Sequence, residues 1–252
     1  GAKEIYLLGQ NVNAYNFERN KLSDLILKIS EIKDLKRIRY TTSHPRDFTE
    51  DLIKVHENCK KLMPLIHLPV QSGSDKILKA MNRKHTIEEY KKIIEKLKKA
   101  KPGIKFSSDF IIGYPGESKK DFEETLKLIK DIGFINSYSF KYSARPGTPA
   151  FNLTKIDDNV AKERLFVFQN VAEKIKINYK KSLKNRIVKV LFENRMKNKN
   201  KYFGRDEYLN PVVVECDDDL SGEVMQVKVS NYNQNTLFGE LLSENSQKNY
   251  AA

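Results

Sequence analysis

Cysteine is almost absent from this sequence. Only two cysteines occur among 252 residues, Cys59 and Cys216, and neither belongs to a Cys-x-x-Cys pair. Thiols so few and so far apart argue against a disulfide framework and against a self-contained metal site. Each cysteine is better explained as a small buried residue than as a ligand.

Long apolar runs and targeting signals are also lacking. No apolar stretch approaches the length of a membrane span, the mean hydropathy is −0.60, and no signal-peptide pattern opens the chain. We therefore expect a cytoplasmic, monomeric protein with no membrane partner. The chain begins Gly1-Ala2-Lys3 and enters a predicted strand at once. This start suggests a chain cut inside a domain.

Positive charge is in excess, and it is unevenly distributed. The formal net charge is +13, yet residues 183–252 hold 10 basic and 10 acidic residues. The surplus therefore belongs to residues 1–182, with 36 Lys and Arg against 23 Asp and Glu. Such a surplus favours a polyanionic partner such as RNA. The alternative is that lysine merely fills solvated helix faces, as in the run 96–99.

Strand-like and helix-like segments alternate through residues 1–182. The predicted strands cover residues 4–9, 37–42, 64–69, 105–112 and 137–142. Helical spacing predicts helices over residues 22–29, 49–58, 74–81, 86–100 and 118–132. Strands that alternate with helices form a parallel sheet. The predicted class is α/β, an open (β/α) barrel that lacks its first strand.

The pattern changes in the last third of the chain. Residues 157–183 predict one long amphipathic connecting helix. Short strands then follow at residues 187–192, 202–205, 212–214, 224–229 and 237–241, separated by Asn, Asp and Gly turns. They predict a small all-β barrel. We expect four parts: a partial barrel (1–156), the connecting helix (157–183), the β-barrel (184–245) and a tail (246–252).

Polar motifs follow the predicted strands, where the loops of α/β folds converge on ligands. The most specific is the turn Gly113–Glu117, which stops a buried strand and leads into a helix that Ser118 can cap. Similar exits hold Gly9-Gln10-Asn11, Thr42-Ser43-His44 and Gln71-Ser72, and the loops add Arg83 and Arg145. Each motif alone has an ordinary turn as its alternative. Together they predict one concave mouth in which Asn11, Gln71 and Glu117 meet.

Five motifs together resemble the radical S-adenosylmethionine methylthiotransferases. They are residues 9–13, 42–45, 67–73, 109–117 and 142–148. The form Gly9-Gln-Asn-Val-Asn13 favours the MiaB-type branch, which methylthiolates N6-isopentenyladenosine beside the tRNA anticodon. Sister branches, acting on threonylcarbamoyl-adenosine or on a ribosomal protein, remain alternatives. The terminal β-barrel resembles the OB-like TRAM domain, a tRNA-binding appendage of this family.

The resemblance implies a cosubstrate and a partner. S-adenosylmethionine would be cleaved to a radical at a [4Fe-4S] cluster, an auxiliary cluster would supply sulfur, and tRNA would be the substrate. The cofactor-binding residues carried over from the family are Gly9, Gln10, Asn11, Ser43, Gln71, Ser72, Arg83, Asp109, Gly113 and Glu117. Charge adds the RNA-binding residues Arg145, Lys189, Arg195, Lys197, Lys199, Lys201 and Arg205, while residues 206–223 are acidic and would repel phosphate. No catalytic residue is assigned.

The sequence departs from the family in its cluster ligands. The family uses a Cys-x-x-x-Cys-x-x-Cys loop for the radical cluster and further N-terminal cysteines for the auxiliary one, and neither set is present. Cys59 and Cys216 cannot substitute, because a cubane needs about three converging thiolates. We therefore expect the chain to be inactive alone and to lack an N-terminal cluster-bearing segment.

Two functions of other classes remain open. A non-catalytic tRNA-binding protein, with the barrel as a relic, would bind tRNA but not S-adenosylmethionine. A (β/α)-barrel lyase or aldolase would need a Schiff-base lysine or metal-binding carboxylates at the strand exits. The exits here offer mainly Gln, Asn, Ser, His and Arg.

Overall fold

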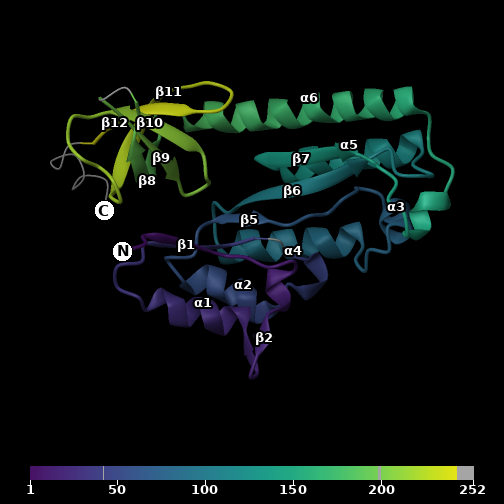
Figure 1. The fold of residues 1–252 in the computed structure, drawn as a ribbon, viewed down its shortest axis with the longest axis horizontal. Coiled ribbons are helices and arrows are strands. Elements are labelled where there is room, and N and C mark those ends of the chain that lie inside the picture. Colours follow the sequence, from purple (N-terminus) through teal and green to yellow (C-terminus); the bar gives the residue numbers. More distant parts are fainter. Residues whose placement is uncertain (42, 198–199, 243–252) are drawn as a thin grey trace. The chain divides into compact units, whose positions relative to one another are not determined.

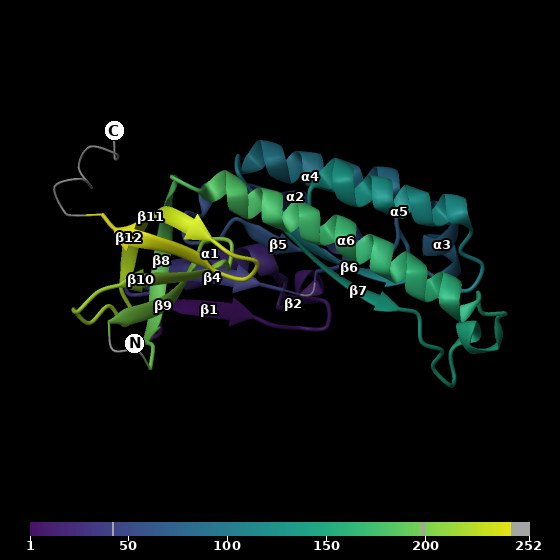
Figure 2. The ribbon, with the colours of Figure 1, turned by 90° about the horizontal axis from the view of Figure 1, so that it is seen from above.

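The computed structural model describes residues 1–41, 43–197 and 200–242 (Figures 1 and 2). The chain forms two compact units. We call Glu4–Lys176 the α/β unit, and the second, made of residues 1–3 together with the chain from Ile177 onward, the β unit. The division falls inside one long helix, α6 (Asp158–Leu183). Among the described helices, none combines the length and apolarity that a membrane crossing requires.

The α/β unit is built on parallel strands. β1 (Glu4–Leu7) pairs with β4 (Arg37–Tyr40), and β6 (Lys105–Ile112) lies between β5 (Leu65–His67) and β7 (Asn136–Lys141). One extended segment joins the two groups, because Met63 N donates to Ile38 O at 3.0 Å shortly before β5 begins. The result is the open parallel arrangement that the alternation predicts, and β1 has a strand neighbour on one edge only among the described residues.

Helices cover the sheet of the α/β unit. They are α1 (Leu22–Ser30), α2 (Glu50–Asn58), α3 (Asp75–Ala80), α4 (Ile87–Ala100) and α5 (Lys119–Ile132). In Figure 1, α1 lies beside α2, and α2 beside α4. Both α4 and α5 start with a capping box, Thr86 with Glu89 and Ser118 with Asp121, which satisfies amide groups that a helix start leaves unpaired.

Aromatic packing joins α6 to the sheet within the α/β unit. The ring of Phe110 on β6 lies 4.7 Å from that of Phe168 on α6 and 5.6 Å from that of Phe134, measured between centroids. All three side chains are fully buried. Burying a side chain of this size stabilises the fold by roughly 1.5–3 kcal/mol. The first part of α6 is therefore an integral element of this core.

Several predicted boundaries were wrong by one to three residues. The strands predicted at 4–9, 37–42 and 64–69 end at Leu7, Tyr40 and His67, because the chain turns into irregular exits there. Two of these exits pass into short 3-10 helices, η1 (Val12–Ala14) and η2 (Pro45–Asp47). A hairpin of β2 (Asn16–Phe17) and β3 (Asn20–Lys21) was not predicted. Its turn holds Glu18 and Arg19 at φ 49 and 67, a geometry that charged residues do not signal in sequence.

The β unit contains a closed five-stranded barrel in the order β10-β12-β11-β8-β9. Its strands are β8 (Ile187–Arg195), β9 (Lys201–Asp206), β10 (Pro211–Glu215), β11 (Val224–Tyr232) and β12 (Leu237–Leu241). Glycine is required where strands press together: a Cβ on Gly204 would lie 2.5 Å from Leu191 O, and one on Gly239 the same distance from Lys228 O. The predicted all-β barrel is confirmed.

Candidate functional site

A cavity of about 710 Å³ opens where β6 and β7 of the α/β unit end. We call it the rim cavity. The turn after β5, the turn after α3, the last residues of β6 and β7 and the loop at residues 143–150 supply its walls. Four predicted site residues line it together: Gln71, Arg83, Asp109 and Arg145. The carboxyl ends of parallel strands place these side chains in one hollow, as expected for an α/β sheet.

Asp109 is the acidic group of the rim cavity. Its carboxylate Oδ2 lies 3.4 Å from His67 Nε2, and the other ring nitrogen of His67, Nδ1, lies 3.0 Å from Ser107 Oγ. The Tyr138 ring packs edge-on against this imidazole at 6.0 Å. Asp109 is therefore held from one side by a positioned imidazole, while its remaining lone pairs face the cavity.

Arg83 supplies positive charge to the same hollow. Burial lowers the pKa of its guanidinium, and the opposing charge of Asp109 partly offsets that shift. The group remains protonated near neutral pH, because the ordinary pKa of arginine is so high. Arg145 adds a second guanidinium from the loop after β7. The rim cavity is thus lined by two guanidinium groups and one carboxylate, together with Lys141, which pairs with Asp158.

Gln71 is held in a backbone conformation unusual for a residue with a side chain. Its φ is 76, in the left-handed region. Hydrogen bonds fix the strain from both sides: Gln71 N donates to Asp109 O at 2.9 Å, and Ile111 N donates to Gln71 O at 3.0 Å. Such strain costs about 1–3 kcal/mol and often marks a ligand-binding position. Gln71 in this conformation is one of the residues that line the rim cavity.

Two tyrosines of the rim cavity were not named as site residues, although they lie in the motifs at residues 109–117 and 142–148. Tyr114 and Tyr142 pack edge to face with centroids 5.0 Å apart. Their hydroxyls donate to backbone carbonyls, Tyr114 to Ala80 O and Tyr142 to Ala150 O, each at 3.0 Å. The two rings are therefore anchored through their hydroxyls in the apolar part of the cavity wall. Their positions directly after β6 and β7 were the signal.

Glu117 and Gly113 do not line the rim cavity. The Glu117 side chain is buried, its Oε1 accepts from Arg164 Nη1 at 2.8 Å, and its Oε2 accepts from Gly113 N at 3.2 Å. Burial raises the pKa of this carboxyl, while the bonds to Arg164 and Gly113 oppose the shift. The predicted turn reaches the rim cavity through Tyr114 instead.

Ser72 is likewise buried in the protein interior. Its Oγ lies 3.4 Å from Thr125 Oγ1 and accepts from Ser74 N at 3.2 Å. The same hydroxyl of Thr125 accepts from Gly73 N at 2.9 Å. These bonds dock the turn after β5 onto α5, and they leave Gln71 as the residue of this motif that reaches the rim cavity.

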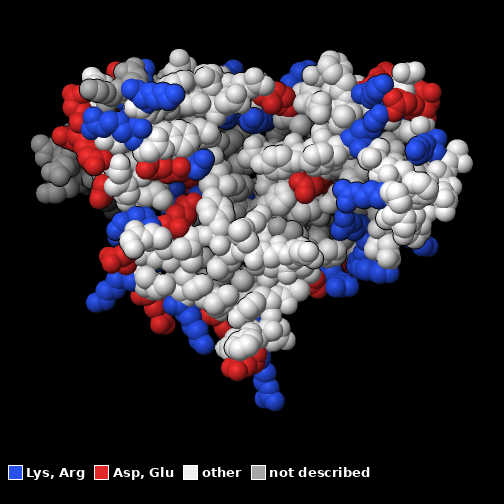
Figure 3. Space-filling view, viewed as in Figure 1, with Lys and Arg blue, Asp and Glu red and all other residues white. Residues whose placement is uncertain are grey.

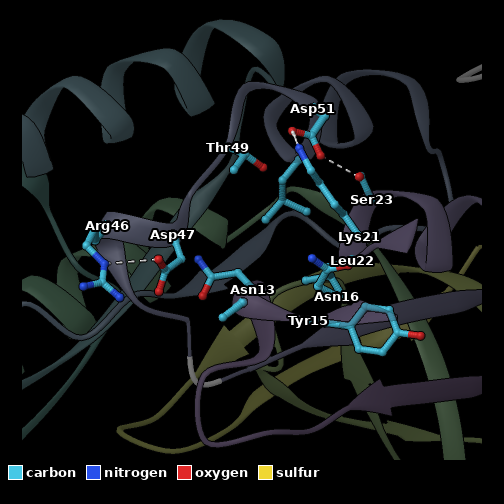
Figure 4. A pocket seen from close by; sticks show the side chains of 12 residues that line it. Asn13, Tyr15, Asn16, Lys21, Leu22, Ser23, Arg46, Asp47, Thr49 and Asp51 are labelled. Carbon is cyan, nitrogen blue, oxygen red and sulfur yellow. Dashed lines mark hydrogen bonds and ion pairs between the residues drawn. The ribbon is translucent and has the colours of Figure 1, made fainter. Parts of the chain in front are cut away.

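The first two exits lie beside a different, smaller pocket. Asn11 Nδ2 donates to Asp47 Oδ2 at 2.6 Å, while Asn11 Oδ1 and Ser43 Oγ are buried without a hydrogen-bond partner among the described residues. Gly9 and Gln10 are exposed. The neighbouring pocket of about 310 Å³ is drawn in Figure 4. There, Asp51 accepts hydrogen bonds from Ser23 and Lys21, and Arg46 forms an ion pair with Asp47. Asn11 thus does not share a cavity with Gln71.

Some of the predicted RNA-binding residues of the β unit already bond to other protein groups, and others are exposed. Arg195 donates to Tyr202 Oη at 2.7 Å and to Asp217 O at 2.8 Å. Arg205 pairs with Glu193 at 2.6 Å, and Lys201 with Glu215 at 3.3 Å. Basic residues therefore contact the segment 206–223, which was predicted to be an acidic region that repels phosphate. Lys189 and Lys197 are exposed, and Lys199 lies outside the described residues.

Ligands for an iron–sulfur cluster are not assembled in the described part of the chain. No group of three or more His, Cys, Asp or Glu side chains there is arranged to hold a metal ion. Cys59 is buried in the α/β unit and Cys216 belongs to the β unit. The residues present thus do not fit a [4Fe-4S] cluster.

Comparison with known proteins identifies two domains and close relatives. Residues 1–129 match the Radical SAM superfamily, and residues 181–242 match the TRAM domain. The chain is 54% identical to the tRNA-2-methylthio-N(6)-dimethylallyladenosine synthase of Pelagibacter ubique, over 100% of this chain and 57% of that protein. It is 49% identical to the protein of the same name from Wolbachia pipientis, over 95% of this chain and 56% of the relative. The chain thus spans little more than half the length of these relatives.

A solved structure shares the fold. Coproporphyrinogen III oxidase (HemN) from Escherichia coli, described as a radical SAM enzyme, superposes with a TM-score of 0.55 at 12% sequence identity. The match covers 97% of this chain and 61% of that one. At such low identity, the likeness concerns the fold alone.

Proposed function

This chain belongs to the radical SAM superfamily, and on that premise we propose that it is the part of a tRNA methylthiotransferase that binds S-adenosylmethionine and tRNA. The observation that carries the proposal is the 54% identity, over the whole chain, to a relative named tRNA-2-methylthio-N(6)-dimethylallyladenosine synthase. The reaction proposed for the complete protein is methylthiolation of N(6)-dimethylallyladenosine in tRNA. The sister reactions, on threonylcarbamoyl-adenosine or a ribosomal protein, have no comparable support.

The rim cavity has a donor set that fits S-adenosylmethionine. Arg83 or Arg145 can pair with the carboxylate, and Asp109 can accept from the ammonium group. Gln71 suits the ribose hydroxyls, and the Tyr114 and Tyr142 rings suit the adenine. Its volume of about 710 Å³ is in the usual range for a small-molecule site. When bound in a radical enzyme, this cosubstrate supplies the radical that abstracts hydrogen from the substrate.

The protein's own part in the reaction is to bind and orient. The imidazole of His67 holds Asp109 in place, and the hydrogen bonds through Gln71 fix the exit of β5 against β6. A positioned cosubstrate needs little further reorganisation, which is the advantage of a preorganised site. The TRAM domain supports RNA binding by the β unit, with exposed Lys189 and Lys197 as phosphate contacts.

The cluster ligands are proposed to lie in the part of the relatives that this chain does not span. The residues that the structure describes do not fit a cluster. The chain alone is therefore expected to be inactive in methylthiolation.

Two binding measurements on the purified chain test the proposal. Filter binding with tRNA is expected to show affinity that falls steeply with salt. Equilibrium dialysis with S-adenosylmethionine is expected to show binding that Arg83→Ala or Asp109→Ala weakens at least about tenfold, since each bond to a charged group contributes about 1.5–3 kcal/mol. Arg46→Ala, an arginine outside the rim cavity, is the matched control.

Each outcome has a distinct meaning. Binding of tRNA without S-adenosylmethionine would favour a non-catalytic tRNA-binding protein. A stoichiometric cubane after anaerobic reconstitution, measured as iron and sulfide, would overturn the proposed lack of activity. Binding of neither ligand would defeat the whole proposal.

A further inference from the structure

A separate polar pocket of about 320 Å³ lies at the turn between α3 and α4. We call it the turn pocket. Lys79, Arg83, Lys84 and His85 line it together with two carboxylates, Asp75 and Glu89. Asn82, at φ 57, makes the tight turn that brings the basic side chains to one place. Arg83 also lines the rim cavity, so one side chain borders both hollows.

Two lysines of the turn pocket are not neutralised by a neighbouring acid. Lys79 and Lys84 are exposed and form no ion pair among the described residues. Nearby lysines behave differently: Lys76 pairs with Asp121 at 3.0 Å, and Lys92 with Glu88 at 2.7 Å. Figure 3 shows basic side chains gathered over the region that Figure 1 labels α3. The positive potential of the turn pocket is therefore available to an anion.

The two carboxylates of the turn pocket are already engaged. Asp75 Oδ1 accepts from Ile87 N at 2.7 Å, and Glu89 Oε2 accepts from Thr86 N at 2.7 Å. Both therefore act as caps at the start of α4, where amide groups carry partial positive charge. Both carboxylates keep their charge, but neither forms an ion pair with Lys79 or Lys84 among the described residues, and the three cationic side chains outnumber them.

His85 adds an unsatisfied hydrogen-bonding group. Its side chain is 7% exposed, and neither ring nitrogen has a hydrogen-bond partner among the described residues. The His44 ring packs against it edge-on at 5.7 Å. Burial, then the charges of His44 and Arg83, lower the pKa of His85 to about 4, so the ring is neutral at pH 7. A buried N–H without a protein acceptor can bond to an ordered water or to a ligand oxygen.

We propose that the turn pocket binds a backbone phosphate of the tRNA whose reacting nucleotide enters the rim cavity. The inference rests on the proposed function, since it presumes that tRNA is the substrate. Two unpaired lysines, a guanidinium and an imidazole N–H are the groups that bind a phosphodiester. Because Arg83 borders both hollows, a phosphate here lies one side chain away from the rim cavity. The turn pocket thus sets the register of the RNA on the α/β unit.

The salt dependence of tRNA binding tests the phosphate site. The variant Lys79→Ala/Lys84→Ala is compared with Lys98→Ala/Lys99→Ala, which removes the same charge about 16 Å along α4. Lys98 and Lys99 are exposed and, like the tested pair, form no ion pair among the described residues. Losing two phosphate contacts is expected to reduce the slope of log K against log salt by about 1.4–1.8. The control is expected to keep the wild-type slope.

Two further measurements separate the possible failures. His85→Asn is expected to weaken tRNA binding severalfold at unchanged slope, with thermal melting checking that the variant is folded. If the wild-type chain does not bind tRNA at all, the proposed function fails. If it binds, but the tested pair and the control have equal slopes, the phosphate site is wrong. Tight binding of inorganic phosphate alone, lost in Lys79→Ala/Lys84→Ala, would show that the turn pocket binds a free anion and not an RNA phosphate.

Discussion

Arg164 Nη1 donates to both the carboxylate Oε1 of Glu117, at 2.8 Å, and its backbone carbonyl, at 2.9 Å. The pair joins the turn after β6 to α6 within the α/β unit. Glu117 also accepts from Gly113 N, so the same carboxylate shapes the turn that presents Tyr114 to the rim cavity. The glutamate acts on the site through structure rather than through ligand contact.

Removing the arginine of this pair is expected to destabilise the chain strongly. Arg164→Met leaves a buried carboxylate without its cation, which costs about 3–5 kcal/mol. The folded-state pKa of Glu117 is already raised by burial and should rise further, so protonation favours the folded state. The cost should therefore be larger at pH 8 than at pH 5 in urea unfolding. Lys162→Met, which breaks an exposed pair with Asp158, should change stability little; equal losses would contradict this account.

Gly73 is expected to tolerate no side chain. A Cβ there would lie 2.5 Å from Thr125 Cα and 2.6 Å from Glu124 O, both backbone atoms of α5. Gly73→Ala should therefore push α5 away and cost about 1–3 kcal/mol, as overpacking does. Gly9→Ala is the control, because its new Cβ would meet its nearest atom at 3.4 Å. Thermal melting of both variants decides the matter, and similar melting temperatures would contradict it.

Acid is expected to destabilise the α/β unit through His56. Burial lowers the folded-state pKa of His56 to about 3. In the unfolded chain His56 therefore binds a proton near pH 6.5, whereas in the folded chain it stays neutral at that pH. The free energy of unfolding falls as pH drops below about 6.5. The loss between pH 7 and pH 5 is about 2 kcal/mol from this group.

His56→Gln is the variant that tests this slope. Glutamine keeps a polar partner for the Tyr40 hydroxyl, which lies 2.5 Å from His56 Nε2, and cannot titrate. The variant should show a flatter dependence of unfolding free energy on pH between 7 and 5. A slope identical to that of the wild type would show that His56 is not its cause.

Arg195 and Lys197 are expected to give different phenotypes despite their proximity in sequence. Arg195 binds Tyr202 Oη and the carbonyl of Asp217, so Arg195→Ala should lower the melting temperature of the β unit. Lys197 is exposed, so Lys197→Ala should leave melting unchanged and reduce the salt slope of tRNA binding by about 0.7–0.9. The opposite assignment of effects would contradict the contacts described here.

The fold could be predicted from the sequence, and four of the predicted site residues line the rim cavity. Gln71 follows one predicted parallel strand and Asp109 lies within another, and the carboxyl ends of such strands share one edge. Glu117 also follows a predicted strand, but its side chain is bonded to Arg164. The two residues are 47 positions apart, and no local sequence pattern indicates such a contact. Asn11 was misplaced because η1 carries it to Asp47 and away from the rim cavity.

Strand β1 has further importance for how this chain behaves in solution. Among the described residues β4 is the one strand that pairs with it, so its other edge has no strand neighbour there. An edge without a strand neighbour is a position at which another extended peptide can be added in register. A peptide added in trans would pair with this edge of the sheet. Without such a peptide, the edge favours edge-to-edge association of two chains.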